Sequence, residues 1–278
     1  MNLARVFCRR FATARTSLCA ATTATTANGT NHENMTASGS ETVSKEEKAK
    51  KAEDVVSQVV RQYDVMSDAM SLGIQHCWKD YFIKKLQPTN DTNLLDVASG
   101  TGDIAFRFMD YSPRGSREVT VCDANGKMIR YGKRKAKRLG KTEGIKWVKG
   151  DATDLPFEDN SFDAYTISFG IRNVSDLNKA LQEAHRVLRP GGRFLCMEFS
   201  QVANPLVDSF IHWWNFEVLP VFSEVLTRHR EPYEDLREKI VHLPNQEAFT
   251  YHIKEAGFTH AGYENVTFGV VAIHTAFK

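Results

Sequence analysis

Short apolar runs alternate with segments of helical spacing between about residue 90 and residue 200. Runs rich in β-branched and other apolar residues predict buried strands, and apolar residues three or four positions apart predict amphipathic helices. The predicted strands here are Asn93–Ala98, Glu118–Cys122, Ile145–Val148, Phe162–Phe169 and Arg193–Phe199. The predicted helices are Asp103–Met109, Lys127–Leu139 and Ser175–Leu188. This alternation is typical of a parallel sheet with helices on both faces.

The regions on either side of this alternation carry different signals. Two β-rich runs, Thr259–Val266 and Gly269–Phe277, are joined by a short connection and predict an antiparallel hairpin at the sheet edge. The remaining predicted helices are 45–62, 74–86 and Asn245–Ala256. We therefore predict an α/β fold with a Rossmann-like seven-stranded sheet, mostly parallel with an antiparallel C-terminal hairpin. Helices cover both faces, and the first two helices form an N-terminal helical lid.

The N-terminal stretch has a composition of its own. It contains no Asp or Glu before Glu33, is rich in Ala and Thr, and carries four arginines, Arg5, Arg9, Arg10 and Arg15. This composition is typical of an organelle transit peptide, and the arginines interrupt the apolar core that a secretory signal needs. A merely disordered tail is the alternative. We predict a transit peptide and disordered segment over 1–34, a polar linker over 35–48 and one domain over 49–278.

Charge and cysteine content exclude several classes of protein. The 36 basic and 34 acidic residues give a net charge of +2, which argues against a nucleic-acid-binding protein. No CxxC pair or Cys/His ligand set occurs among the five cysteines, so we expect neither a disulfide framework nor a metal site. These cysteines are Cys8, Cys19, Cys77, Cys122 and Cys196.

One apolar stretch stands out near the C-terminal third. Phe210–Leu226 is largely apolar but contains His212, Glu217, Pro220 and Glu224, so it is not expected to span a bilayer. Core packing and a lid or channel for a hydrophobic substrate tail are both compatible with this pattern.

The sharpest motif lies where the first strand becomes a helix, at Asp96–Asp103 (DVASGTGD). Gly100 and Gly102 lack a Cβ atom, so the backbone can turn tightly and approach a ligand closely. Asp123 ends the next strand, where its carboxylate can accept both hydroxyl groups of a ribose. The same loop also fits a dinucleotide fingerprint, because a small residue and a later acid follow the glycines at suitable spacing.

Two features favour an adenosine cofactor with a cationic amino-acid part over a dinucleotide. Asp96 precedes the loop, where it can face a cationic ligand and would repel a pyrophosphate. Asp151 and Ala152 follow the third strand, where a carboxylate and a backbone N–H can pair with the adenine edge. A third motif, Leu188–Gly192 (LRPGG), predicts a tight turn before the fifth strand.

In this order, the glycine loop, the acid after strand two, GDA-x-x-LPF-x-x-x-x-FD and RVLRPGG resemble the motifs of class I S-adenosylmethionine-dependent methyltransferases. Further segments resemble the ubiquinone/menaquinone biosynthesis C-methyltransferase family over roughly residues 55 to 278. They are Tyr63–Gly73, His76–Lys79, Ile167–Val174 and Met197–Ser200. One position departs from the family pattern: Lys239 stands where the family usually has serine.

The resemblance implies S-adenosyl-L-methionine as the cofactor. It also implies cofactor contacts at Thr101, Asp123, Asp151, Ala152 and Ser168, beside those expected from the loop at Asp96, Gly100 and Gly102. The activity implied is C-methylation of a polyprenylated methoxy-benzoquinol ring in ubiquinone biosynthesis.

With a transit peptide, the family resemblance implies a mitochondrial protein on the matrix side of the inner membrane. The partners expected from it are the polyprenyl benzoquinol substrate, a multi-subunit ubiquinone-synthesis complex and a peripheral membrane contact. A homodimer is a further expectation, and no nucleic-acid partner is expected. The alternatives are a catalytically weak scaffold subunit that binds the cofactor and, less favoured, an NAD-dependent Rossmann oxidoreductase.

The chemistry requires a nucleophilic ring carbon, and a ring carbon becomes nucleophilic when a ring hydroxyl loses its proton. Because a free phenol has a pKa of about 10, the site must favour the ionised form. Arg172 lies just past the fourth strand and is our candidate for stabilising the phenolate or holding a water that takes the proton. Asn173 is expected to orient the same oxygen, and Tyr63 to stack on or bond the ring. The alternatives are an ion pair with an acid for Arg172 and lid packing for Tyr63. His76 is expected to make a structural polar contact.

Overall fold

The computed structural model describes residues 35–38, 41–44, 68, 71–112, 118–202, 204–214 and 243–278. Its helices are α4 (Gln75–Leu86), α5 (Asp103–Tyr111), α6 (Gly126–Arg138), α7 (Leu177–Val187), α8 (Pro205–Trp213) and α11 (Gln246–Glu255), with the short 3-10 turns η1 (Ile171–Asn173) and η3 (Thr267–Gly269). Its strands are β1 (Met35–Ser38), β2 (Glu41–Ser44), β3 (Asn93–Val97), β4 (Glu118–Asp123), β5 (Ile145–Lys149), β6 (Phe162–Ser168), β7 (Leu188–Phe199), β8 (Thr259–Val266) and β9 (Val271–Phe277).

The main sheet has seven strands in the order β5-β4-β3-β6-β7-β9-β8. The strands from β5 to β7 are parallel, while β9 is antiparallel to both β7 and β8. This arrangement confirms the predicted fold class, including the C-terminal hairpin. The chain builds outward from β3 to β5 and then returns to place β6 on the other side of β3, so a topological switch point lies between β3 and β6.

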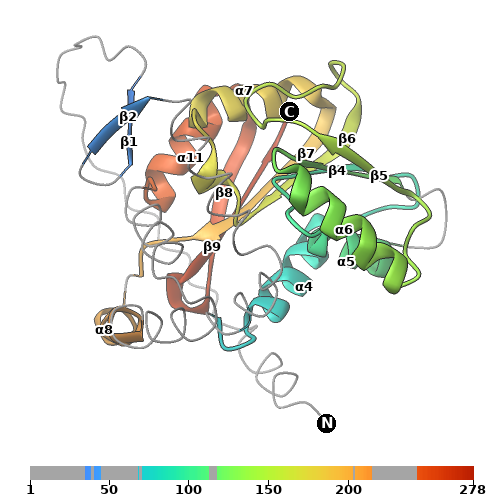
Figure 1. The fold of residues 1–278 in the computed structure, drawn as a ribbon. Coiled ribbons are helices and arrows are strands. Elements are labelled where there is room, and N and C mark those ends of the chain that lie inside the picture. The colour runs from blue at the N-terminus through green and yellow to red at the C-terminus, as the bar shows by residue number, and fades with distance from the viewer. Residues whose placement is uncertain are drawn as a thin grey trace.

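Helices cover both faces of the sheet, as Figure 1 shows. On one face, α7 and α11 bury apolar residues such as Leu181 and Phe249 in one core cluster. On the other face, α4 and α5 bury residues such as Phe82 and Phe108, and α6 adds Ala136. Burying an aromatic side chain of this size stabilises the fold by roughly 1.5–3 kcal/mol, so both layers hold the sheet in place.

Three helices begin at a side-chain cap. Asn125, Asp176 and Asn245 precede α6, α7 and α11, and the side-chain oxygen of each accepts a backbone N–H of the first turn. Such caps satisfy donors that a helix start leaves without a partner, at about 1 kcal/mol each. In contrast, α5 follows Gly102 and has no side-chain cap, so its N–H groups remain directed at the loop where a ligand is expected.

Several predicted boundaries differ from the structure. The strand β7 begins at Leu188 rather than Arg193, because the LRPGG turn is a bulge within the strand. Gly191 has a φ of +79° there, and its N–H donates to the carbonyl of Lys278. The turn η3 delays the start of β9 to Val271.

The N-terminal predictions are only partly covered by the described residues. The strands β1 and β2 form an antiparallel pair inside the segment predicted to be a linker. The predicted helix over 45–62 lies outside the described residues, so of the two lid helices only α4 is described. The limits of the transit peptide and of the domain stay predictions.

Candidate functional site

The candidate site lies at the carboxyl edge of the parallel strands, where β3 and β6 meet. The two residues that follow these strands by one position, Ala98 and Phe169, have left-handed backbones with φ of 49° and 55°. The loops touch here, because a Cβ atom on Gly170 would lie 2.5 Å from the Cβ of Ala98. Such backbone strain in non-glycine residues costs about 1–3 kcal/mol each and is concentrated at functional sites.

The glycine loop is shaped by a tryptophan behind it. Gly100 and Gly102 have φ of 60° and 86°, a region that favours glycine. A Cβ atom on Gly102 would lie 2.7 Å from Cη2 of Trp147, which comes from β5. The loop is therefore held between the sheet edge and the Trp147 ring, and any larger residue at Gly102 would displace it.

Asp123 links the loop to the end of β4. Its Oδ2 accepts the N–H of Gly100 at 2.8 Å, and its Oδ1 accepts the N–H of Asn125 at 2.8 Å. Each carboxylate oxygen has capacity for a second hydrogen bond. Asp123 thus both fixes the loop and lies at the edge where the ribose of an adenosine cofactor is expected.

Asp96 is completely buried below the loop. Its Oδ1 accepts the hydroxyl of Thr166 at 2.8 Å, and its Oδ2 accepts the hydroxyl of Ser99. Burial raises the pKa of this carboxyl to about 7. The carboxylate has no exposed surface and anchors the loop, so the direct contact with a cationic ligand that its place in the sequence suggests stays a prediction.

The residues after β5 form a compact turn. The Oδ1 of Asp151 accepts both the N–H and the hydroxyl of Thr153 at 2.8 Å. No described residue binds its Oδ2, and Asp151 is exposed while Ala152 is buried. Gly150 permits this turn, because a Cβ atom there would lie 2.7 Å from Pro156. The turn presents a carboxylate at the edge where adenine is expected.

Thr101 is placed differently from the other predicted contacts. Its side chain is 1% exposed, and the Nζ of Lys135 donates to its Oγ1 at 3.4 Å. The side chain of Thr101 is thus in contact with α6, and a cofactor contact by this residue stays a prediction.

Asp103 is the centre of a charge network that the sequence reading did not foresee. Its carboxylate lies 2.8 Å from Lys79, 3.1 Å from Arg107 and 3.5 Å from Lys135. Desolvation alone would raise the pKa of this carboxyl, but the three cations outweigh it and hold that pKa well below its usual range. The network ties α4 and α6 to the first turn of α5, so it supports the loop from behind.

Arg172 lies in η1, just past β6, and pairs with a buried acid. Its Nη1 donates to Oε1 of Glu198 at 2.6 Å, and both side chains are largely buried. Asn173 is the next residue of the same turn and is partly buried. The sequence reading named an ion pair as the alternative role for Arg172. The pair is present, and it lies at the ligand edge of the sheet.

Three buried polar atoms at this edge have no partner among the described residues. They are Oγ of Ser168, Nε of Arg172 and Oε2 of Glu198. Ser168 is paired in the sheet with Met197, the neighbour of Glu198. Since buried polar atoms in folded proteins are nearly always hydrogen-bonded, a cluster of unpartnered ones indicates where a ligand binds.

An aromatic group borders this cluster. Phe169 and Phe199 have ring centroids 4.9 Å apart, and Trp78 lies 6.2 Å and 6.4 Å from them. The guanidinium of Arg172 lies 5.6 Å from the centre of the Phe199 ring. The edge near β6 and β7 therefore combines a flat apolar wall with one buried ion pair, which suits an aromatic ring that carries hydroxyl groups.

Other sequence predictions have mixed outcomes. Tyr63, the third proposed catalytic residue, lies outside the described residues. His76 lies 2.7 Å from the carboxylate of Asp68 and 2.8 Å from Arg107, so the expected structural contact is present. The apolar stretch Phe210–Leu226 is described only as far as residue 214.

The residues that sequence reasoning missed are those that support others. Glu198 sits in a segment recognised as a family signature, and an acid inside an apolar strand was a usable signal. Lys79 also lies in such a segment, but nothing in the sequence pointed to its pairing with Asp103. Trp147 gave no signal, because its role depends on contacts between distant elements.

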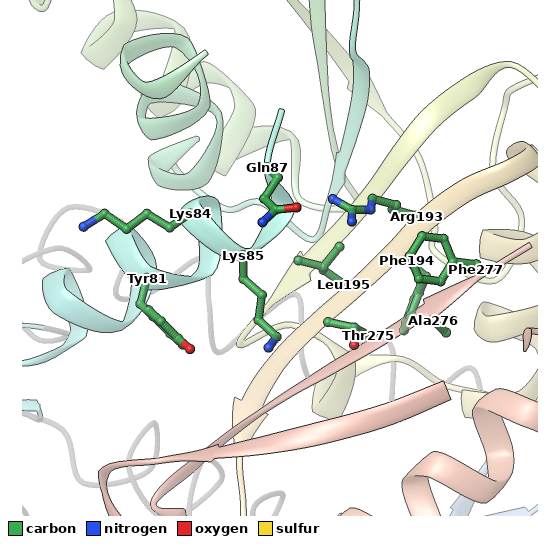
Figure 2. A pocket seen from close by; sticks show the side chains of 10 residues that line it. All are labelled: Tyr81, Lys84, Lys85, Gln87, Arg193, Phe194, Leu195, Thr275, Ala276 and Phe277. Atoms are coloured by element: carbon green, nitrogen blue, oxygen red, sulfur yellow. The ribbon is translucent and has the colours of Figure 1, made fainter. Parts of the chain in front are cut away.

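A separate cavity of about 450 Å³ lies at the opposite, amino edge of the sheet (Figure 2). It is bordered by the end of α4, by Arg193–Leu195 of β7 and by Thr275–Phe277 of β9. Its cations have partners: Lys85 pairs with Glu264, and Arg193 donates to the carbonyl of Leu86. It is distant from the glycine loop and is not the cofactor site.

Within the described residues, no cluster of His, Cys, Asp and Glu is arranged to hold a metal ion. None of the described helices combines the length and apolar character that a membrane-spanning segment needs.

Comparison with known sequences gives one consistent result. The family model described as the ubiE/COQ5 methyltransferase family matches residues 41–278. The mitochondrial 2-methoxy-6-polyprenyl-1,4-benzoquinol methylase of Rattus norvegicus is 47% identical, over 86% of this chain and 83% of the relative. The protein of the same name from Homo sapiens is also 47% identical with the same coverage. That from Xenopus laevis is 44% identical, over 86% of this chain and 88% of the relative.

Solved structures share the fold at low sequence identity. A possible histamine N-methyltransferase from Thermotoga maritima has a TM-score of 0.54 at 18% identity, covering 81% of this chain and 97% of that one. The [4+2]-cyclase SpnF has a TM-score of 0.59 at 17% identity, covering 82% and 96%. Because one fold carries such different reactions, the structural likeness supports the architecture and not the activity.

Proposed function

Since this chain belongs to the ubiE/COQ5 methyltransferase family, we propose that it methylates a ring carbon of a polyprenylated methoxy-benzoquinol in ubiquinone biosynthesis. The family makes the chain a methyltransferase that uses S-adenosylmethionine, as the motif order predicted. The relatives are named for a benzoquinol substrate. The observation that supports this substrate here is the buried Arg172–Glu198 pair beside an aromatic wall at the cofactor edge.

The residues at the carboxyl edge fit this cofactor. When bound, it supplies a methyl group on a positively charged sulfur. Asp123 is suited to hold the ribose hydroxyls, and Asp151 with the backbone at Ala152 is suited to hold the adenine edge. Gly100 and Gly102 allow the backbone to approach closely. Ser168 ends β6 at the same edge, and its hydroxyl is buried without a partner among the described residues. The acids at this edge would repel the negative charge of a pyrophosphate, which disfavours the dinucleotide alternative.

Arg172 has the chemistry that the ring needs. A guanidinium stays charged at neutral pH and cannot take a proton, but it stabilises an oxyanion on the ring. Loss of the hydroxyl proton would raise the electron density at the neighbouring ring carbon, the atom that would accept the methyl group, and the guanidinium would favour this ionised form of the ring. Asn173 follows Arg172 in the same turn and is proposed to orient the same oxygen. Tyr63 is proposed to stack on the ring or to form a hydrogen bond with it.

The finer location is also a proposal. The relatives are named mitochondrial, and the segment before Glu33, which contains no acid, supports import. We place the protein on the matrix side of the inner membrane, in a multi-subunit ubiquinone-synthesis complex, with a peripheral membrane contact and a homodimer as further expectations. The helix α8 supports contact with an apolar partner such as a lipid or a polyprenyl tail, because its Leu206 is 83% exposed and its Trp213 is 52% exposed.

The role of α8 in holding a polyprenyl tail is testable with paired substrates. Replacing Trp213 and Trp214 by Ala should reduce turnover of a long-tail benzoquinol more than that of a tail-free one, because only the former needs apolar contacts along its tail. If the variant lost the same fraction of its rate on both substrates, each compared with the unmodified protein, a tail-binding role would be excluded.

The main experiment is a turnover assay with purified protein, S-adenosylmethionine and a short-tail methoxy-benzoquinol under reducing conditions. We expect the ring to gain one methyl group, detected by mass spectrometry, together with stoichiometric S-adenosylhomocysteine. Binding of the cofactor without methylation of any benzoquinol would favour the scaffold alternative. Binding of NAD in its place would contradict the assignment.

A further inference from the structure

Glu198 is a deeply buried acid beside Arg172 at the proposed reaction centre. It lies one residue before the carboxyl end of β7, is 2% exposed, and its sheet partner in β9 is Ala272. An acid at such a position is costly unless its charge and hydrogen-bond capacity are used. The proposed function gives Glu198 no task beyond its pairing with Arg172.

The hydrogen bonds of Glu198 are distributed unequally between its two oxygens. Oε1 accepts from Nη1 of Arg172 at 2.6 Å and from the N–H of Phe199 at 2.9 Å. Oε2 is buried and has no partner among the described residues, and neither has Nε of Arg172. A pair built only for stability would normally satisfy both oxygens, because a half-satisfied buried ion pair stabilises poorly.

We propose that Glu198 is the proton acceptor of the reaction, taking at Oε2 the proton that the ring hydroxyl loses, directly or through one water. This inference rests on the proposed function. The hydroxyl O–H bond breaks, its proton forms a bond with Oε2, and its electron pair stays on the ring. The ring carbon then forms a bond to the methyl group as the methyl–sulfur bond breaks. The electron pair of that bond stays on the sulfur. The ring hydrogen then leaves as a proton to water, which restores the aromatic ring, and the ring oxygen takes back the first proton from Oε2 of Glu198.

Charge conservation favours this assignment over a solvent base. Before the transfer, Arg172 is neutralised by Glu198; after it, Glu198 is neutral and Arg172 faces the phenolate. The buried site keeps the same net charge throughout, so no additional charge is desolvated. Arg172 thereby exchanges one anionic partner for another.

The surroundings of Glu198 are consistent with a proton acceptor. Burial raises the pKa of its carboxyl, although the charge of Arg172 opposes the rise. The other titratable group that interacts with it is the buried thiol of Cys196 on the same strand, whose pKa is raised as well. From β9, His274 lies opposite Cys196, and burial lowers its pKa to about 4, so it is neutral in the working range.

The first test uses Glu198→Gln, which keeps the side-chain shape and an oxygen that accepts from Arg172 but cannot take a proton. Turnover should fall by about 10²–10⁴-fold, the usual contribution of a general base, while the affinity for S-adenosylmethionine changes by less than a few-fold. The matched control is Glu264→Gln, which removes the ion pair with Lys85 far from the site and should leave turnover unchanged.

The pH profile separates a proton acceptor from a positioning role. For the unmodified protein, kcat should fall on the acid side with a midpoint above the ordinary value for a glutamate, because Glu198 must be ionised to accept the proton. Glu198→Asp should retain this acid limb at a reduced rate, and Glu198→Gln should lose it. An unchanged acid limb in Glu198→Gln, or a rate within a few-fold of normal, would overturn the inference.

A second measurement needs no turnover. A nitrophenol ring ligand bound with S-adenosylhomocysteine reports its ionisation by visible absorbance. In Glu198→Gln, Arg172 lacks its carboxylate partner, so the bound ligand should ionise at lower pH than in the unmodified protein. Equal ionisation in both proteins would show that the pair does not face the ring. Failure of the unmodified protein to methylate any benzoquinol would instead overturn the proposed function, so the two failures are distinguishable.

Discussion

At the scale of single residues, the surroundings of an acid decide its chemistry more than its place in a motif. Asp96 and Asp103 frame the same eight-residue motif. Burial raises the pKa of Asp96 to about 7, although its two hydroxyl partners oppose the rise, whereas three cations around Asp103 lower the pKa of that acid. The first acid is therefore partly protonated near neutral pH and the second is always charged.

This difference predicts a pH-dependent stability for Asp96. Its pKa is ordinary in the unfolded chain and about 7 in the fold. From about pH 4 to pH 7, the unfolded state binds fewer protons than the folded state, so the free energy of unfolding falls as the pH rises. The effect amounts to a few kcal/mol, since one pKa unit corresponds to about 1.36 kcal/mol.

Asp96→Asn cannot ionise and should lack this contribution. Its stability relative to the unmodified protein should therefore rise between pH 5 and pH 8, as measured by urea unfolding at both pH values. Asp110→Asn changes an exposed acid paired with Lys141 and serves as the control. A stability difference for Asp96→Asn that is the same at both pH values would contradict the raised pKa.

Arg172 gives a second prediction at this scale. Arg172→Ala should abolish turnover and leave the affinity for S-adenosylmethionine within a few-fold, because the guanidinium pairs with Glu198 beside the Phe199 ring, where the substrate ring is proposed to bind, and not with the glycine loop. Calorimetric titration and a turnover assay on the same preparation check this. A loss of affinity as large as the loss of turnover would indicate that Arg172 only supports the structure.

At the scale of elements, close packing between α6 and the glycine loop depends on a glycine inside the helix. A Cβ atom on Gly132 would lie 2.4 Å and 2.5 Å from ring atoms of Trp147 and 3.1 Å from the carbonyl of Thr101. Trp147 thus fills the space that the missing side chain leaves, and the helix holds the loop through this contact.

Gly132→Ala should therefore destabilise the protein by about 1–3 kcal/mol through overpacking, although Ala normally stabilises a helix interior relative to Gly by up to about 1 kcal/mol. Gly126→Ala, in the first turn of the same helix, has only the Lys149 side chain at 3.9 Å and should be neutral or stabilising. Thermal unfolding of both variants checks this. Equal effects at the two positions would show that the contact is not tight.

At the scale of the whole molecule, the strand order gathers the cofactor residues. Asp96, Asp123, Asp151 and Ser168 belong to four segments that are separated in sequence, yet parallel strands bring their carboxyl ends to one edge. A ligand at this edge contacts the ends of most central strands, so its binding should stabilise the fold as a unit.

A cofactor present at about 100 times its Kd should stabilise the protein by about 2.7 kcal/mol. For a domain of this size that corresponds to a rise in Tm of roughly 5–10 °C, measurable in a thermal-shift assay with S-adenosylmethionine. NAD at the same concentration should cause no shift, and Asp123→Ala should remove most of the shift with S-adenosylmethionine. A shift of equal size with NAD would contradict the cofactor assignment.

The sequence by itself determined the layer architecture and the elements of the cofactor edge. Periodicity located β3 to β6 to within about a residue, because buried parallel strands are short apolar runs with turn residues after them. The same local reasoning identified the loop with Gly100 and Gly102 and the acids Asp123 and Asp151. Each lies at a strand end and can be recognised without knowing its distant contacts.

Only the tertiary structure decided which side chains meet. The pairing of Arg172 with Glu198, the three cations around Asp103 and the Trp147 ring behind the loop join residues from elements far apart in sequence. Local patterns contain the spacing of residues along one element but not the contacts between elements, which depend on how strands are ordered and helices packed. The full burial of Asp96 also follows from that packing. From the sequence alone, an acid in a short apolar strand is predicted to contact a ligand at the strand end, and only the packing of the helices on the sheet shows that it is buried.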